Sequence, residues 1–288
     1  RALGVSVSTV KRWVDEQVLP AHKTAGGHRK LLIADVIELA RRDDLPHADL
    51  SRLVGGRPPR QVSDARGIAD SLYHALITGD GERVRSVIVG SYHGGMAIEQ
   101  LADQAIAPAM KAIGDDWASG RLDVMEEHRA TQLCAATLFE LKAMLENRVG
   151  KERLRAVGGA VEGDFSLLPT LLVQMTLLDS GWDAVNLGPN TPFPSLAKAM
   201  VELRPRLLWL SVAHIGSKDD FVRGYCDLYH QAENMGIAVA IGGGALTESV
   251  RVRIPYTTYG DGLSHLAAFA RTLHPRPKRP RRGRPPRH

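Results

Sequence analysis

Cysteine is scarce in this chain, and long apolar runs are absent. Cys134 and Cys226 stand singly among 288 residues with no CxxC pair, so no cysteine-based metal site is indicated. No run of about 18 apolar residues occurs and no basic-then-apolar leader opens the chain, so we expect neither a membrane span nor a secretory signal. Two lone thiols are typical of a reducing compartment. We therefore expect a cytoplasmic protein in which both cysteines pack as core residues.

Positive charge is concentrated at the two ends of the chain. The formal net charge is +5, but the last fifteen residues hold seven Lys and Arg and no acid. Residues 1–42 carry eight Lys and Arg against four acids. This distribution favours a polyanionic partner that the termini contact.

Residues 1–42 have the pattern of a small DNA-binding domain. A hydroxyl-rich start predicts a helix from Ser8 to Glu16, Gly26-Gly27 predicts a tight turn, and 33–42 reads as a second helix. A short helix followed by a turn with basic flanks fits a winged helix-turn-helix. A solvated basic helix with a loop remains the alternative.

The candidate DNA contacts lie on one face of the first helix and around the turn. Arg12 is placed to bind a guanine, and the neighbouring hydroxyl and basic side chains are placed to bind phosphates or base edges. The full set is Ser8, Thr9, Lys11, Arg12, His22, Lys23, His28, Arg29 and Lys30.

The rest of the chain divides into a linker, a helical block and an α/β block. Residues 43–63 are rich in charge, Pro and Gly and are expected to be a linker. Residues 64–150 predict a four-helix bundle, with helices at about 64–78, 81–93, 95–117 and 124–147. Residues 151–273 alternate apolar runs (156–161, 184–187, 207–212 and 238–241) with amphipathic stretches, which predicts a Rossmann-like, doubly wound parallel sheet.

Three short segments follow predicted strands, and the ligands of doubly wound sheets bind at those strand ends. They are 187–192, Leu210-Ser211 and 241–244, where glycines let backbone approach a ligand closely. From these segments, the candidate ligand-binding residues are Ser211, Gly242 and Gly243.

Trp117 precedes the adjacent pair Glu127-His128 by ten residues, and Ser119-Gly120 interrupts the helix between them. One interpretation is a lid in which the indole covers a flat ligand while Glu127 and His128 bond to its polar edge. The alternative is a buried tryptophan and ordinary first-turn acids.

These motifs resemble a known family. Residues 3–13, 19–20 and 24–29 look like the N-terminal domain of MerR-type regulators, although the chain begins inside that motif, so we expect reduced DNA affinity. The bundle and α/β block resemble the cobalamin-binding module of corrinoid methyltransferases and CarH-type light-dependent repressors. The Trp-x9-Glu-His spacing is similar to the CarH type, in which it surrounds the upper face of adenosylcobalamin. Over residues 1–273 the chain most resembles CarH/LitR-type regulators.

Three positions depart from that pattern. The family's Glu-x-Asp-x-His-x-x-Gly motif carries the lower cobalt ligand, and the resemblance implies that Glu162, Asp164 and Ser166 lie at the ligand. Ser166 stands in place of the motif's histidine, and Pro169 stands in place of its glycine. Ala118 stands where CarH-type proteins have a histidine that captures cobalt after photolysis. A hydroxyl is a much poorer cobalt donor than imidazole, so we assign no metal ligand. Three alternatives follow: adenosylcobalamin or another corrinoid with its own base or water as lower ligand, another tetrapyrrole such as a bilin or haem, or no cofactor.

The tail from residue 274 is rich in Pro and Arg. Its Arg282-Gly283-Arg284 core resembles an AT-hook, which implies minor-groove contacts by Arg282 and Arg284. A generic basic tail is the alternative.

Together these features predict a DNA-binding regulator, a repressor that forms a homo-oligomer (dimer or tetramer) under control of a cobalamin-type ligand and light. We do not expect an enzyme. The competing hypotheses are a corrinoid methyltransferase or mutase subunit and a cofactor-free repressor that a protein partner controls.

Overall fold

The computed structural model describes residues 3, 5–23, 29–31, 35–36, 39, 65–146 and 153–273. The expected linker, His28 and the tail with Arg282 and Arg284 lie outside these residues. For β1 (His22–Lys23) and β2 (Arg29–Lys30) the backbone alone is described. None of the helices in the described ranges is both long and apolar enough to cross a membrane.

The N-terminal part contains α1 (Val7–Asp15), within one residue of the predicted helix. The Ser6 hydroxyl caps it by accepting the backbone N–H of Thr9 at 3.2 Å. The apolar face of α1 packs on a small core, and β1 pairs antiparallel with β2. The residues of this core include Leu3, Val10, Trp13, Val14, Leu19, Val36 and Leu39. The predicted turn at Gly26-Gly27 and most of the predicted helix 33–42 lie outside the described residues.

The helical part begins with α3 (Ala65–Thr78) and α4 (Gly81–His93). A continuous helical stretch follows, made of α5 (Ile98–Leu101), the π-helical turn η2 (Ala102–Ile106) and α6 (Ala107–Ala118). The last helix is α7 (Val124–Glu146). These bounds agree with the predicted helices, except that the third begins later and contains the π-helical turn.

The α/β part is a five-stranded parallel sheet with the order β4-β3-β5-β6-β7. A sheet with this strand order is doubly wound, and its topological switch point lies between β3 and β5. The strands are β3 (Arg155–Ala160), β4 (Asp183–Asn186), β5 (Leu207–Ser211), β6 (Ala238–Gly242) and β7 (Thr258–Gly260). The helices are α8 (Leu167–Asp179), α9 (Phe193–Leu203), α10 (Lys218–Asn234), α11 (Glu248–Arg251) and α12 (Leu263–Leu273).

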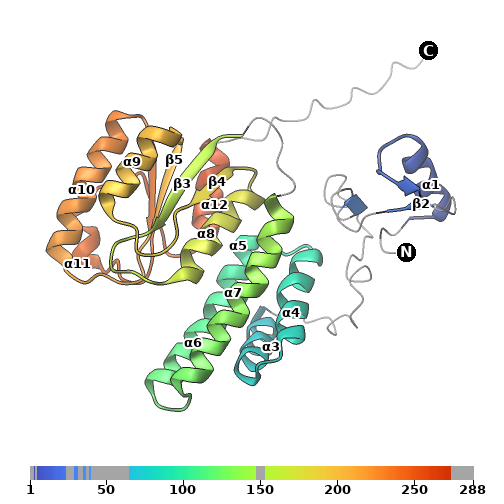
Figure 1. Cartoon of the computed structure of the whole chain (residues 1–288), viewed down its shortest axis with the longest axis horizontal. Coiled ribbons are helices and arrows are strands. Elements are labelled where there is room, and N and C mark those ends of the chain that lie inside the picture. Colours follow the sequence, from blue (N-terminus) through green and yellow to red (C-terminus); the bar gives the residue numbers. More distant parts are fainter. Residues whose placement is uncertain are drawn as a thin grey trace, which may run out of the picture.

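Two apolar cores hold the sheet, one on each face. One core joins α9, α10 and α11 to the sheet. Helices α8 and α12 lie on the opposite face, the side of the helical part (Figure 1). The other core joins them to the sheet and continues into the helical part, so the two parts share a single core. Cys134 lies in this shared core, where burial raises the pKa of its thiol to about 12, as expected for a packed cysteine, whereas Cys226 is only partly buried.

Polar contacts reinforce the junction of the two parts. The Tyr92 hydroxyl donates to Oδ1 of Asp179 at 2.8 Å, and the backbone N–H of Ile98 donates to Oδ2 at 3.3 Å. The buried carboxylate of Glu99 pairs with Arg271 on α12. A shared core with these links fixes the space that remains between the helical part and the sheet.

Candidate functional site

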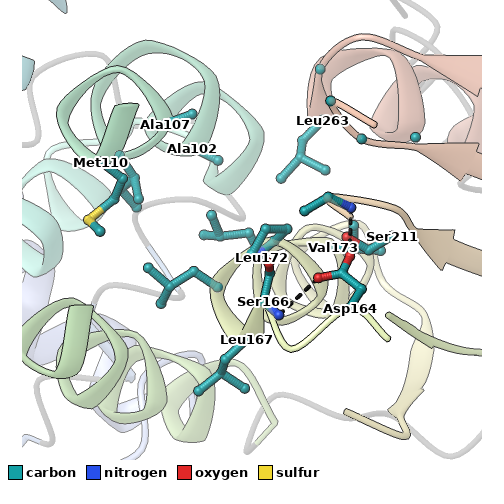
Figure 2. A pocket seen from close by; sticks show the side chains of 18 of the residues that line it. Ala102, Ala107, Met110, Asp164, Ser166, Leu167, Leu172, Val173, Ser211 and Leu263 are labelled. Atoms are coloured by element: carbon teal, nitrogen blue, oxygen red, sulfur yellow. Dashed lines mark hydrogen bonds between the residues drawn. The ribbon is translucent and has the colours of Figure 1, made fainter. Parts of the chain in front are cut away.

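A large pocket lies between the helical part and the carboxyl ends of the parallel strands. Its volume is about 1740 Å³, well above the roughly 300–1,000 Å³ of ordinary small-molecule sites. Figure 2 shows Ala102, Ala107 and Met110 on one side of it and Asp164 and Ser166 on another. The position beside the switch point is where doubly wound sheets bind ligands.

The floor of the pocket is organised by one buried carboxylate. Asp164 has no exposed surface, and its Oδ1 accepts the backbone N–H of Ser166 at 2.9 Å (Figure 2). Its Oδ2 accepts the backbone N–H groups of Ala213 at 2.6 Å and His214 at 3.3 Å. Three donors stabilise this buried charge, and they join the loop after β3 to the loop after β5. Ser166 lines the pocket, and its hydroxyl makes no capping bond to α8.

Glycines form the strand ends at the floor. Gly243 has φ +130°, and a Cβ placed on it would lie 2.2 Å from the carbonyl oxygen of Val212. A Cβ on Gly242 would lie 2.9 Å from the carbonyl oxygen of Gly260. Both glycines line the pocket beside Ser211, which is buried at the end of β5. The absence of side chains here lets strand-end backbone approach a ligand.

The helical wall carries the predicted acid–imidazole pair. Glu127 and His128 both line the pocket from the first turns of α7. The Thr131 hydroxyl donates to Oε1 of Glu127 at 2.9 Å, and His128 Nε2 lies 3.6 Å from Oε2. The His128 side chain is 74% exposed, so both groups present polar atoms to the open side of the pocket.

Asp103 is a wall residue that sequence reasoning missed. It lies in the π-helical turn and accepts the backbone N–H groups of Leu263 at 2.8 Å and Ser264 at 2.9 Å, together with the Ser264 hydroxyl at 2.7 Å. A carboxylate of the helical part thus caps α12 of the α/β part. No local pattern signals this contact, because its partners lie about 160 residues away.

Two of the predicted ligand contacts do not line the pocket. Trp117 is half exposed and lies seven residues after Met110, on the same helical face but about 10 Å farther along the axis. Contact of Trp117 with a ligand therefore stays a prediction. Glu162 is exposed and also lies outside the pocket lining.

The turn that follows Trp117 is held by Asp116. The hydroxyl of Tyr73 and then the guanidinium of Arg121 lower the pKa of Asp116, because both stabilise its charged form. The Arg121 Nε donates to Oδ1 of Asp116 at 2.7 Å. These bonds fix the end of α6, so Trp117 keeps its exposed place at the tip.

The segment 187–192, which we expected at the ligand, does not line the pocket and instead binds the loop after β3, which forms part of the pocket floor. Strand β4 lies beyond β3, on the side away from β5 and β6, so its carboxyl end does not meet the pocket. Asn190 Oδ1 accepts the backbone N–H of Gly163 at 2.8 Å, and the Asn190 N–H donates to the Asp164 carbonyl at 2.7 Å. The segment thereby holds the loop that carries Asp164.

The predicted DNA-contact residues of α1 lie on its outer face. Ser8, Lys11 and Arg12 are exposed and Thr9 is half-buried, while the opposite face packs on the small N-terminal core. Hydroxyl and basic side chains on one accessible face are the groups that bind phosphates and base edges.

The chain is similar to known proteins, both in its helical part and over most of its length. Residues 68–142 match the family described as B12 binding domain. The chain is 27% identical to the HTH-type transcriptional repressor CarH of Myxococcus xanthus over 263 residues, which is 84% of this chain and 86% of that protein. It is 23% identical over 229 residues to the HTH-type transcriptional repressor CarA of the same organism, covering 77% of each.

A solved structure shares the fold. The monomethylamine corrinoid protein of Methanosarcina barkeri superposes with a TM-score of 0.58 at 17% identity, over 72% of this chain and 96% of that one. The helical part and the Rossmann-like sheet together thus form a B12-binding fold.

The pocket fits a corrinoid in size and in the character of its lining. Apolar helical walls and glycine strand ends suit a broad ring with polar edges. At the floor, Ser166, whose backbone N–H binds Asp164, presents a hydroxyl group to the pocket.

Proposed function

We propose that this chain is a DNA-binding transcription regulator, a repressor, whose pocket binds a corrinoid of the cobalamin type. The pocket is the observation that carries this proposal, because it lies where a doubly wound sheet binds its ligands and is large enough for such a ring. The similarity to two transcriptional repressors over most of the chain supports the regulatory role. The exposed basic face of α1, read as part of a MerR-like winged helix-turn-helix, supports DNA as the partner.

The residues that would hold the ligand come from both parts of the protein. Ser211 and the glycines at 242–243 would contact the lower face of the ring, and Glu127 and His128 would bond to the upper group from α7. Trp117, which is exposed at the tip of a four-helix bundle cap, would stack on that group. When bound, adenosylcobalamin supplies a cobalt–carbon bond that light can break.

The regulatory step that follows from this arrangement is ligand-dependent assembly. A ligand that contacts both parts stabilises the arrangement in which they both hold it, the closed form. The free energy gained rises with the logarithm of ligand concentration over its dissociation constant. We propose that the closed form assembles as a dimer or tetramer in the cytoplasm. Several α1 helices would then bind DNA together, with the AT-hook-like tail adding minor-groove and phosphate contacts.

A visible absorption spectrum of the purified protein tests the ligand directly. The protein is mixed in the dark with adenosylcobalamin, and in parallel with haem and with a bilin, and each mixture is passed through gel filtration. The proposal predicts that the corrinoid co-elutes with the protein and that its spectrum changes on illumination. Retention of haem or bilin but not corrinoid would identify another tetrapyrrole as the ligand. Retention of none would favour the cofactor-free repressor.

A further inference from the structure

Two imidazoles line the pocket, and they lie on different sides of it. His128 comes from α7 on the helical wall, and His214 comes from the loop after β5 on the sheet side. Two of the carboxylates that line the pocket are already engaged, since Asp164 accepts three backbone N–H groups and Asp103 caps α12. Lys111 and Gln132 also line the pocket, but an ammonium group has no lone pair and an amide nitrogen is a poor donor. The two imidazoles are therefore the nitrogen donors of this lining that suit a transition metal.

His214 lies beside the position where the family motif has its histidine. The carboxylate of Asp164 binds the backbone of Ser166 through one oxygen and the backbone of His214 through the other. A side chain at 214 thus starts from the same part of the floor as a side chain at 166. The His214 side chain is exposed, and its imidazole has no hydrogen-bond partner among the described residues.

His128 is less suited to the same role. Its Nε2 lies 3.6 Å from the Glu127 carboxylate, so one of its two ring nitrogens already faces a polar partner. It also belongs to α7, across the pocket from the strand ends. An imidazole on the sheet side is needed to reach the lower face of a ring that rests on those ends.

We propose that His214 supplies the lower nitrogen ligand to the cobalt of a bound corrinoid, in place of a histidine at 166. This inference rests on the proposed function. It revises the expectation from the sequence that the ligand's own base, or water, takes the lower position. The neutral imidazole binds through one ring nitrogen and keeps its proton on the other.

The test uses cobinamide, a corrinoid without a nucleotide base, reduced to the cobalt(II) state. Any nitrogen splitting in its electron paramagnetic resonance spectrum then comes from the protein. We expect splitting in the parent protein that changes when its histidines carry nitrogen-15. His214→Ala should abolish the splitting and weaken cobinamide binding about tenfold or more, since loss of even an indirect supporting residue costs about 10–100-fold.

The matched control is His128→Ala, which should keep the splitting. Alanine at 214 retains the backbone N–H that Asp164 accepts, so the floor should remain folded, and circular dichroism checks this. Three outcomes would overturn this inference but leave the proposed function standing. The splitting could persist in His214→Ala, it could disappear in His128→Ala, or it could be missing from a parent protein that retains cobinamide. A parent protein that retains no corrinoid would overturn the proposed function as well.

Discussion

Asp103 accepts the backbone N–H of Leu263 at 2.8 Å, so a carboxylate in a π-helical turn of the helical part caps a helix of the α/β part. Both residues line the pocket. The bond therefore closes one wall of the cavity and joins the two parts at the same point. Residues that hold this junction should influence stability and ligand binding together.

Replacing Asp103 tests this junction. Asp103→Ala should lower the free energy of unfolding by about 0.5–2 kcal/mol, the usual cost of losing a helix cap, and should weaken corrinoid binding. Urea denaturation and corrinoid titration measure the two effects. The matched control is Asp115→Ala, which removes an exposed pair with Lys111 and should change stability by less than about 1 kcal/mol. Equal effects of the two substitutions would contradict a capping role for Asp103.

The backbone at the end of β6 should tolerate no side chain at 243. Gly243→Ala places a Cβ against the Val212 carbonyl at a φ of +130° and should cost about 1–3 kcal/mol of stability. Gly244→Ala is the control, because a Cβ there meets no atom within 4 Å. Thermal denaturation of both variants measures the difference. If they unfold at the same temperature, the strand end is less constrained than its geometry indicates.

Trp117 should contribute to ligand binding although it lies outside the pocket lining. Trp117→Ala should weaken adenosylcobalamin binding by about 0.5–1.5 kcal/mol, the usual contribution of a stacked aromatic beyond its burial. Phe139→Ala, which alters an exposed aromatic of α7 away from the pocket, should leave binding unchanged. Calorimetric titration of the three proteins decides. Identical affinities would leave Trp117 without a role at the ligand.

The α1 surface should determine base preference. Arg12→Ala should reduce DNA affinity by about 1–3 kcal/mol and relax the preference at one base pair, as expected for loss of a guanine contact. Lys11→Ala should instead weaken binding equally across sequences, as expected for a phosphate contact. Competition binding with a panel of duplexes separates the two. An Arg12 variant with the parent's sequence preference would place base recognition elsewhere.

Deletion of residues 275–288 tests the basic tail. The truncated protein should bind both specific and unrelated DNA more weakly, and its slope of log affinity against log salt should become shallower by several units, at about 0.9 per neutralised phosphate. If Arg282 and Arg284 enter the minor groove, A/T-rich flanks should lose more affinity than G/C-rich ones. Unchanged affinity, slope and flank preference would leave the tail without a DNA role.

The sequence predicts elements well where the pattern is local. Helix periodicity and glycine breaks place α3, α4 and α7 within two residues, and apolar runs place four of the parallel strands. Strand β7 was missed because its three half-buried residues form no apolar run. The π-helical turn was missed because its sequence, Ala102–Ile106, contains no residue pattern that distinguishes it from an ordinary α-helix.

The site depends on contacts that local patterns do not reveal. Glu127, His128, Asp164 and Ser166 were predicted and line the pocket. Asp103 meets its partners across 160 residues. The segment 187–192 follows β4 at the edge of the sheet and does not line the pocket. Spacing gives a residue's face on an element, whereas the tertiary arrangement decides whether that face reaches the pocket.

The most direct test of the proposed function is DNA affinity measured against adenosylcobalamin concentration, in the dark and after illumination. The probe is a duplex that the protein itself selects from a random pool, and sedimentation of the same samples gives the oligomer mass. We predict that affinity and mass rise together with the corrinoid in the dark and fall together after illumination. A protein that binds the corrinoid but shows the same DNA affinity and mass in every condition would contradict ligand-controlled repression.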